Sequence, residues 1–208
     1  EINYDDGSNL VMTFAGGVLA STDHQDLADA YAWTRITTTH TGTGALASRH
    51  YEFDDGLELD QTFTAGVMTS QTHSDIGDAF NWTSILTNYA AGQISSRTLT
   101  YDDGTALTQT FTSGVLTHQL QTDALNVMAW SQIETNYSAA GVILSRIYDY
   151  DTGIRLTQTF AGGVLTSALH NDTLNTAAWS TIQTTFGAGG ATAMSRVTLD
   201  GGVQYVAG

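Results

Sequence analysis

The sequence contains no cysteine, no proline and no lysine, so its six basic residues are all arginines. Without cysteine, the chain can form neither a disulfide bond nor a thiolate metal site. Six basic residues against 21 acidic ones give a net charge of −15, and nucleic acids need clustered cations that this chain does not have. No apolar run is long enough to cross a bilayer. These absences predict no nucleic-acid partner and no membrane insertion.

Charged residues make up only 13% of the 208 residues, so threonine, serine, glycine and alanine supply most of the polar surface. This composition is common in secreted bacterial β proteins, and we expect an extracellular location. The chain begins at Glu1 rather than at methionine, which favours a processed or excised part of a larger chain.

An internal repeat dominates the sequence. The stretch "YDDGTALTQTFTSGVLT" at Tyr101 returns in edited form at Tyr4, Phe53 and Tyr150. Four tryptophans recur in step, 49, 48 and 49 residues apart, and a Ser-Arg pair follows each of them. We therefore predict one repeat domain over residues 1–208, with units of about 1–49, 50–97, 98–146 and 147–196 and a partial fifth unit at 197–208.

Within a unit the hydrophobic pattern has a period of two, which indicates β-strands. In "ALTQTF", Leu107 and Gln109 fall on one face, and Thr108 falls on the other. The third unit predicts four strands, at 95–101, 106–111, 115–121 and 130–137, joined by Asp-Gly or Ser-Gly turns and one longer connection. The fold class is therefore all-β, with tandem four-stranded antiparallel units.

The longer connection carries the pattern Asp-x-x-[Asp/Asn]-x-x-x-Trp. Its first Asp suits the N-cap of a single helical turn, so we expect one helical turn per unit, at a seam between sheets. The units then form either an elongated repeat array, which we favour, or a small β-propeller.

Two columns of residues are candidates for ligand binding. The tryptophans either stack on sugar rings or fill a core seam; they are Trp33, Trp82, Trp130 and Trp179. The arginines share a face with tyrosines, and an arginine on an apolar face needs a carboxylate or carbonyl partner, most obviously an acid of the longer connection. They form either structural ion pairs or a row that grips an acidic polysaccharide; they are Arg49, Arg97, Arg146 and Arg196.

The acids of the longer connection are candidate ligands for Ca²⁺, which prefers oxygen atoms. They are Asp26, Asp29, Asp75, Asp78, Asp123 and Asp172. In the third and fourth units, Asn126 and Asn175 stand where the second acid is expected. No nucleophile motif or phosphate-binding loop occurs, and near-identical units offer no single special place, so we expect no enzymatic activity.

The YDDG turn at Tyr101 and the Asp26-x-x-Asp29-x-x-x-Trp33 segment, with their counterparts, resemble tandem repeats of large secreted RTX-type, calcium-associated proteins of marine bacteria. The resemblance implies an extracellular location and calcium dependence, but it implies no activity. We expect a non-catalytic binding module with repeated shallow sites for polysaccharide. The alternative is a calcium-stabilised structural spacer of a large secreted adhesin.

Overall fold

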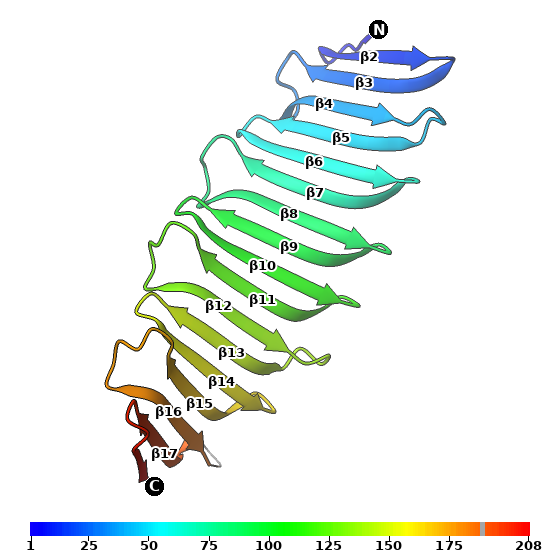
Figure 1. Cartoon of the computed structure of the whole chain (residues 1–208). Helices are drawn as coiled ribbons and strands as arrows, with labels where there is room; N and C mark the ends of the chain where they lie inside the picture. Colours follow the sequence, from blue (N-terminus) through cyan, green and yellow to red (C-terminus); the bar gives the residue numbers. More distant parts are fainter. Residues whose placement is uncertain (188–189) are drawn as a thin grey trace. The chain divides into compact units, whose positions relative to one another are not determined.

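Strands with the predicted period of two make up most of the computed structural model (Figure 1). The structure describes residues 1–187 and 190–208, and these contain 18 strands and no α-helix. The four strands predicted in the third unit are confirmed within two residues at each end, as β9 (Gln93–Tyr101), β10 (Thr105–Thr112), β11 (Val115–Asp123) and β12 (Trp130–Tyr137). The fold is therefore all-β.

The chain divides into two compact units, each larger than one sequence repeat. We call Glu1–Asp102 unit 1 and Asp103–Gly208 unit 2, and from here on 'repeat' names the shorter sequence units. The remaining strands of unit 1 are β1 (Ile2–Asn3), β2 (Ser8–Ala15), β3 (Val18–Asp26), β4 (Trp33–His40), β5 (Leu46–Phe53), β6 (Leu57–Thr64), β7 (Val67–Asp75) and β8 (Trp82–Ala90). Those of unit 2 are β13 (Ile143–Tyr150), β14 (Ile154–Ala161), β15 (Val164–Asp172), β16 (Trp179–Phe186), β17 (Thr192–Leu199) and β18 (Gln204–Ala207).

Each unit is an open antiparallel meander. In unit 1 every strand from β1 to β9 pairs with its neighbours in sequence. In unit 2 the same holds from β10 to β18. The pairing runs on through the Trp strand of each repeat, whereas four-stranded propeller blades would interrupt it. The propeller alternative is therefore wrong within each unit.

The longer connections contain no helical turn and mark no seam between sheets. Residues 27–32, which link β3 to β4, form bends, and the two strands they join are directly paired. The helix fails because its fourth residue is left-handed: Asp29 has a φ of 55°, and a left-handed residue ends a helix. Asp26 still accepts the N–H of Ala28, as an N-cap would, but its shorter bond comes from Tyr31, five residues on and beyond any first helical turn.

A β-bulge recurs beside each tryptophan. Register shifts between Trp33 and Arg35, and again at the start of β8, β12 and β16. The residue after each tryptophan is Thr or Ser, and its hydroxyl donates a 3.3 Å hydrogen bond to a carbonyl of the next strand; the four donors are Thr34, Thr83, Ser131 and Ser180. The Trp-[Ser/Thr] pair thus satisfies a backbone acceptor at an irregular point of the ladder.

Directly paired residues share a face of the sheet, which divides each unit into two unlike faces. We name one the aromatic face. Its apolar row in unit 1 is Leu10, His24, Ile36, Tyr51, Leu59, His73, Ile85 and Leu99. The opposite, polar face carries a Ser/Thr row, which in unit 1 includes Thr13, Ser21, Thr39, Ser48, Thr62 and Ser70.

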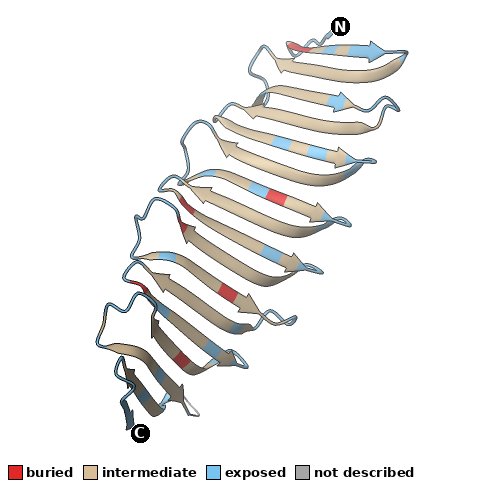
Figure 2. Ribbon diagram, viewed as in Figure 1, coloured by how far each residue is buried: buried red, intermediate tan, exposed pale blue. Residues whose placement is uncertain are grey.

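Neither face is covered by a second layer, because the strands contact chiefly their sequence neighbours. Most side chains are therefore half-buried (Figure 2). Among the described residues Ala168 is the only buried hydrophobic one, at 7% exposure. The apolar side chains of the aromatic face shield one another along the rows, and this lateral packing takes the place of a central core.

Candidate functional site

The aromatic face presents two further rows beside the apolar row. The arginine row of unit 1 runs through Met12, Thr22, Thr38, Arg49, Gln61, Gln71, Thr87 and Arg97. That of unit 2 runs through Gln109, Gln119, Thr135, Arg146, Gln158, Ala168, Thr184 and Ser195. The tryptophan row lies nearer the long loops, where Trp33 pairs with Phe53 and Trp82 with Tyr101.

All four tryptophans are half-buried on this face. In unit 1 each indole carries an aromatic neighbour from its own loop: Tyr31 stacks on Trp33 at 5.1 Å between ring centroids, and Phe80 stacks on Trp82 at 5.3 Å. In unit 2 the equivalent loop residues are Met128 and Ala177. Trp130 and Trp179 consequently lack the stacked ring that covers their counterparts.

The arginines do not form one equivalent set. Arg49, Arg97 and Arg146 share the aromatic face, but Arg196 pairs with Gln183 and lies exposed on the polar face. The shift follows from the last repeat, in which Ser195 rather than the arginine stands opposite Thr184. The row predicted from sequence therefore has three members.

The expected acidic partners of these three arginines are absent among the described residues. Arg49 donates from Nη1 to the hydroxyl of Tyr51 at 2.9 Å, and its guanidinium lies 5.8 Å from the centre of that ring. Arg146 donates to the Tyr148 hydroxyl and to Thr135, both at 3.3 Å. In both cases the hydroxyl of the tyrosine two residues after the arginine accepts the hydrogen bond that was predicted to go to a carboxylate.

Arg97 differs from both. The residue two positions later is Leu99, which offers no hydroxyl. The Arg97 Nε–H is buried and has no hydrogen-bond partner among the described residues. An unsatisfied buried donor costs about 1–3 kcal/mol. Arg97 also lines a hollow of about 250 Å³ with Gln71, His73, Ile85, Thr87 and Leu99.

His73 is the other titratable group in that hollow. Desolvation, and secondarily the charge of Arg97, lower its pKa. The imidazole is consequently neutral at pH 7, and Arg97 is the one cation among the residues that line the hollow.

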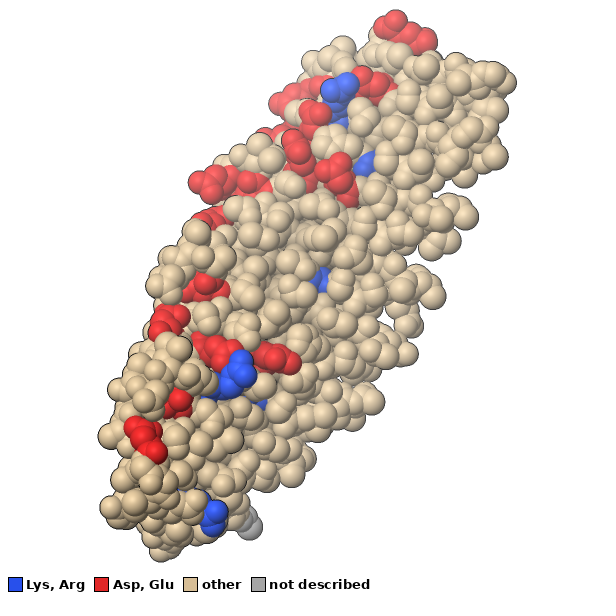
Figure 3. Space-filling model, in the orientation of Figure 1, with Lys and Arg blue, Asp and Glu red and all other residues tan. Residues whose placement is uncertain are grey.

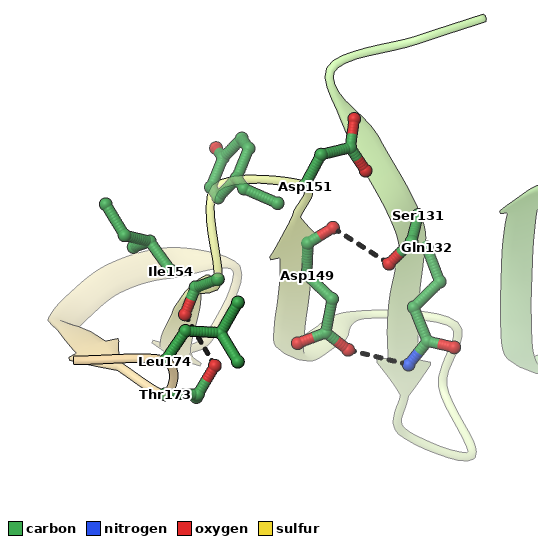
Figure 4. Close-up of a pocket in the computed structure, with 9 residues that line it drawn as sticks. Ser131, Gln132, Asp149, Asp151, Ile154, Thr173 and Leu174 are labelled. Atoms are coloured by element: carbon green, nitrogen blue, oxygen red, sulfur yellow. Dashed lines mark hydrogen bonds between the residues drawn. The ribbon is translucent and has the colours of Figure 1, made fainter. Parts of the chain in front are cut away.

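A larger hollow of about 440 Å³ opens at the loop edge of unit 2 (Figure 4). Its main charged group, Asp149, accepts hydrogen bonds from Gln132 at 2.8 Å and from both Nε and Nη2 of Arg155. The Arg155 hydrogen bond is the main cause of the lowered pKa of Asp149. Because this carboxylate already has its partners, we regard the hollow as part of the scaffold.

Acidic residues gather at one edge of each unit, which we call the loop edge (Figure 3). It contains the Asp-Gly turns and the long connections; in unit 1 these are residues 5–7, 54–56, 27–32 and 76–81. The opposite glycine-turn edge, such as residues 41–45 and 65–66, carries no charge.

The candidate calcium ligands at the loop edge mostly bind the backbone. Asp75 accepts from the N–H groups of Ala79 and Phe80, Asp123 from those of Val127 and Met128, and Asp172 from that of Ala177. Asp29 and Asp78 have a positive φ, as Asn126 and Asn175 do. In the described part of the chain, no three acidic or histidine side chains are gathered as a metal site.

The glutamines, the histidines and the buried threonines of the aromatic face were not singled out from sequence. Thr87 and Thr135 are 1% and 3% exposed and lie directly beside Arg97 and Arg146. The sequence does contain a signal that could have identified some of these residues. Gln61, Gln109 and Gln158 recur at about the repeat spacing, as do His24 and His73. Their shared face was visible only once strand register was known.

No protein-family model matches the chain, and no curated protein matches it. Among the described residues, no helix is long and apolar enough to cross a membrane.

Proposed function

We propose that the chain is a non-catalytic carbohydrate-binding module whose aromatic face contacts polysaccharide. One observation carries this proposal: aromatic side chains stand half-exposed in rows on a sheet face that no second layer covers. The faces of indole and phenol rings pack well against the apolar face of a pyranose ring. Glutamine, threonine and arginine side chains in the adjacent row supply the hydrogen bonds that fix a sugar's orientation.

The repeat suits a polymer ligand. Each unit carries two tryptophans on the aromatic face, so one polysaccharide chain can contact several weak sites. A second contact on the same polymer is effectively intramolecular, and the combined affinity exceeds that of one shallow site. Because Trp130 and Trp179 have no stacked loop ring, we propose unit 2 as the stronger sugar platform.

Affinity electrophoresis against alginate, xylan and laminarin tests this function. We expect at least one polymer to retard the chain, and Trp130→Ala to weaken the retardation more than Trp82→Ala, whose indole is covered by Phe80. Arg196→Gln, on the polar face, is the matched control and should migrate as the parent does. Thermal melts check that each variant is folded. No retardation by any polymer would reject the proposal.

A calcium-stabilised spacer is the second candidate, and the loop edge supports it. Desolvation, followed by the negative charges of Asp29, Asp26 and Asp55, raises the pKa of Asp54. A divalent cation would relieve such repulsion. If the chain is a spacer of this kind, EDTA will lower its melting temperature and no polysaccharide will retard it.

We also propose that the chain is extracellular and belongs to a larger secreted protein. The resemblance of the repeat to RTX-type proteins supports an extracellular location and a place in a larger secreted chain. An open sheet accepts further antiparallel strands at its edges, which supports the elongated array predicted from the repeat.

A further inference from the structure

We infer that the hollow at Arg97 is a subsite for the carboxylate of a uronic acid residue, which makes the ligand an acidic polysaccharide. This inference rests on the proposed function and specifies its ligand. The copies of the repeat differ two residues after the arginine. In the first and third repeats a tyrosine occupies the second position after the arginine and receives its hydrogen bond. In the second repeat that position is Leu99.

The exchange of tyrosine for leucine has two effects in one place. It removes the phenol hydroxyl that accepts from the arginine Nη1 in the other two copies. The buried Nε–H of Arg97 has no partner either, although Thr87 stands where Thr135 accepts from the Nε–H of Arg146. It also leaves room, because Leu99 is shorter than tyrosine and lines the 250 Å³ hollow together with Arg97. A guanidinium with an unpartnered donor beside an unfilled volume offers an anion both charge and space.

The lining of the hollow identifies the class of anion. Ile85 and Leu99 form an apolar wall, and Gln71 and Thr87 add polar groups beside the guanidinium. A volume of about 250 Å³ is below the roughly 300–1,000 Å³ typical of pockets for drug-sized ligands. One pyranose ring with a carboxylate matches this combination of an apolar side, hydroxyl groups and one negative charge. A bare inorganic anion would leave the apolar wall unused.

The carboxylate would accept charge-assisted hydrogen bonds from the guanidinium, and Arg97 is the one cation among the lining residues. Arg49 and Arg146 already donate to tyrosine hydroxyls, so they are not equivalent sites. We therefore expect one uronate subsite in unit 1 rather than one in every repeat.

The experiment follows the side-chain Nε–H signal of Arg97 by ¹H–¹⁵N NMR during titration with D-glucuronate, D-glucose and acetate. We expect glucuronate to shift this signal at concentrations where glucose and acetate do not. Equal shifts from glucose would overturn the role of the carboxylate. Equal shifts from acetate would overturn the assignment to a sugar.

Leu99→Tyr is the decisive variant. Tyr51 and Tyr148 each pair with an isoleucine, Ile36 and Ile133, and Leu99 pairs with Ile85, so the new tyrosine enters a setting that the chain already uses. We expect Leu99→Tyr and Arg97→Gln each to weaken glucuronate binding about tenfold or more, and Arg196→Gln, on the polar face, to leave it unchanged. Full affinity in Leu99→Tyr would overturn the inference.

The reverse exchange, Tyr148→Leu, frees Nη1 of Arg146, whose Nε still donates to Thr135, and should add a second glucuronate site per chain. A stoichiometry that stays at one would contradict the role given to the tyrosine.

The experiments distinguish failure of the uronate subsite from failure of the proposed function. If a neutral polymer retards the chain while glucuronate leaves Arg97 unmoved, carbohydrate binding stands and the uronate subsite does not. If glucuronate shifts Arg97 and no polymer retards the chain, the subsite stands without the polysaccharide function.

Discussion

Asp29, Asp78, Asn126 and Asn175 occupy equivalent positions, and each has a φ between 53° and 57°. Aspartate and asparagine tolerate this left-handed conformation better than other residues with a side chain. The alternation of acid and amide at this position is therefore explained by backbone geometry, and it needs no metal. The aspartate three residues earlier has another role, because its carboxylate accepts backbone N–H groups of the loop.

We predict that Asp78→Asn will change the free energy of unfolding by less than about 0.5 kcal/mol. Asp78→Ala should cost about 1 kcal/mol, because alanine pays the strain of a left-handed residue. Urea unfolding measures both, with and without calcium. A loss of calcium-dependent stability in Asp78→Asn would show instead that this carboxylate is a ligand.

Asp6 provides a pH-sensitive contact at the same edge. Its carboxylate accepts a 2.7 Å hydrogen bond from the Tyr31 hydroxyl and bonds from the N–H and hydroxyl of Ser8. These bonds, led by that of Tyr31, lower the pKa of Asp6 to about 2. A lowered pKa means that the contact stabilises the fold above the ordinary value of 3.8 and is lost as the pH falls toward 2.

We predict that Tyr31→Phe will raise the pKa of Asp6 toward its ordinary value, because the largest stabilising bond is gone. Carboxyl ¹³C shifts measured between pH 1.5 and 6 report the titration. Tyr205, far along the chain, provides the control variant Tyr205→Phe, which should leave Asp6 unchanged. A midpoint for Asp6 that stays near 2 in Tyr31→Phe would contradict the assignment.

Most neighbouring strands of the fold are joined by glycine turns, and the two edges of the sheet use glycine differently. Gly56 in an Asp-Gly turn and Gly66 at the glycine-turn edge have φ values of 82° and 79°. A Cβ atom on Gly56 would meet the Cα of Gly77 at 2.8 Å, whereas one on Gly66 would meet nothing within 4 Å. The loop edge is therefore packed at Gly56, and the opposite edge is open at Gly66.

Gly66→Ala should cost about 1–2 kcal/mol for left-handed strain alone. Gly56→Ala should cost more, because the Gly77 backbone must also move. Thermal or urea unfolding of the two variants gives the comparison. Equal losses would mean that the turn and the loop are not in firm contact.

The whole molecule stabilises its sheets with very little deep burial. Only one hydrophobic residue among those described is buried, and the apolar rows remain half-open to water on the aromatic face. The heat capacity of unfolding arises mainly from newly exposed apolar surface. A protein built in this way has less such surface left to expose.

We predict a heat-capacity change of unfolding below about 2 kcal/mol/K, where an ordinary globular protein of 208 residues would give about 2.5–3 kcal/mol/K. Calorimetry at several pH values gives the number, and the urea m-value should be correspondingly small. An ordinary value for the isolated chain would indicate that something covers the aromatic face in solution, such as a second copy.

The sequence by itself determined the repeat, the strands, their tight turns and the face shared by Arg49, Tyr51 and Phe53, because alternation and glycine turns are local properties. Only the tertiary structure decided which face the tryptophans join. By simple alternation Trp33 and Ile36, three residues apart, would point to opposite faces. A bulge between Trp33 and Arg35 brings the indole to the aromatic face.

Tertiary structure also decided the partners of the arginines. Alternation placed Arg97 on an apolar face and required a partner for it, and the predicted candidates were the acidic residues of the longer connections. Only the side-chain contacts of the structure show that a tyrosine two residues along the same strand accepts from Nη1 of Arg49 and of Arg146, and that the Nε–H of Arg97, beside Leu99, has no partner among the described residues. From the sequence alone, Leu99 at the position of Tyr51 and Tyr148 indicates only a conservative change in packing. Beside a guanidinium whose Nε–H is buried, it becomes an unfilled site, because the cost of an unpaired donor depends on what surrounds it.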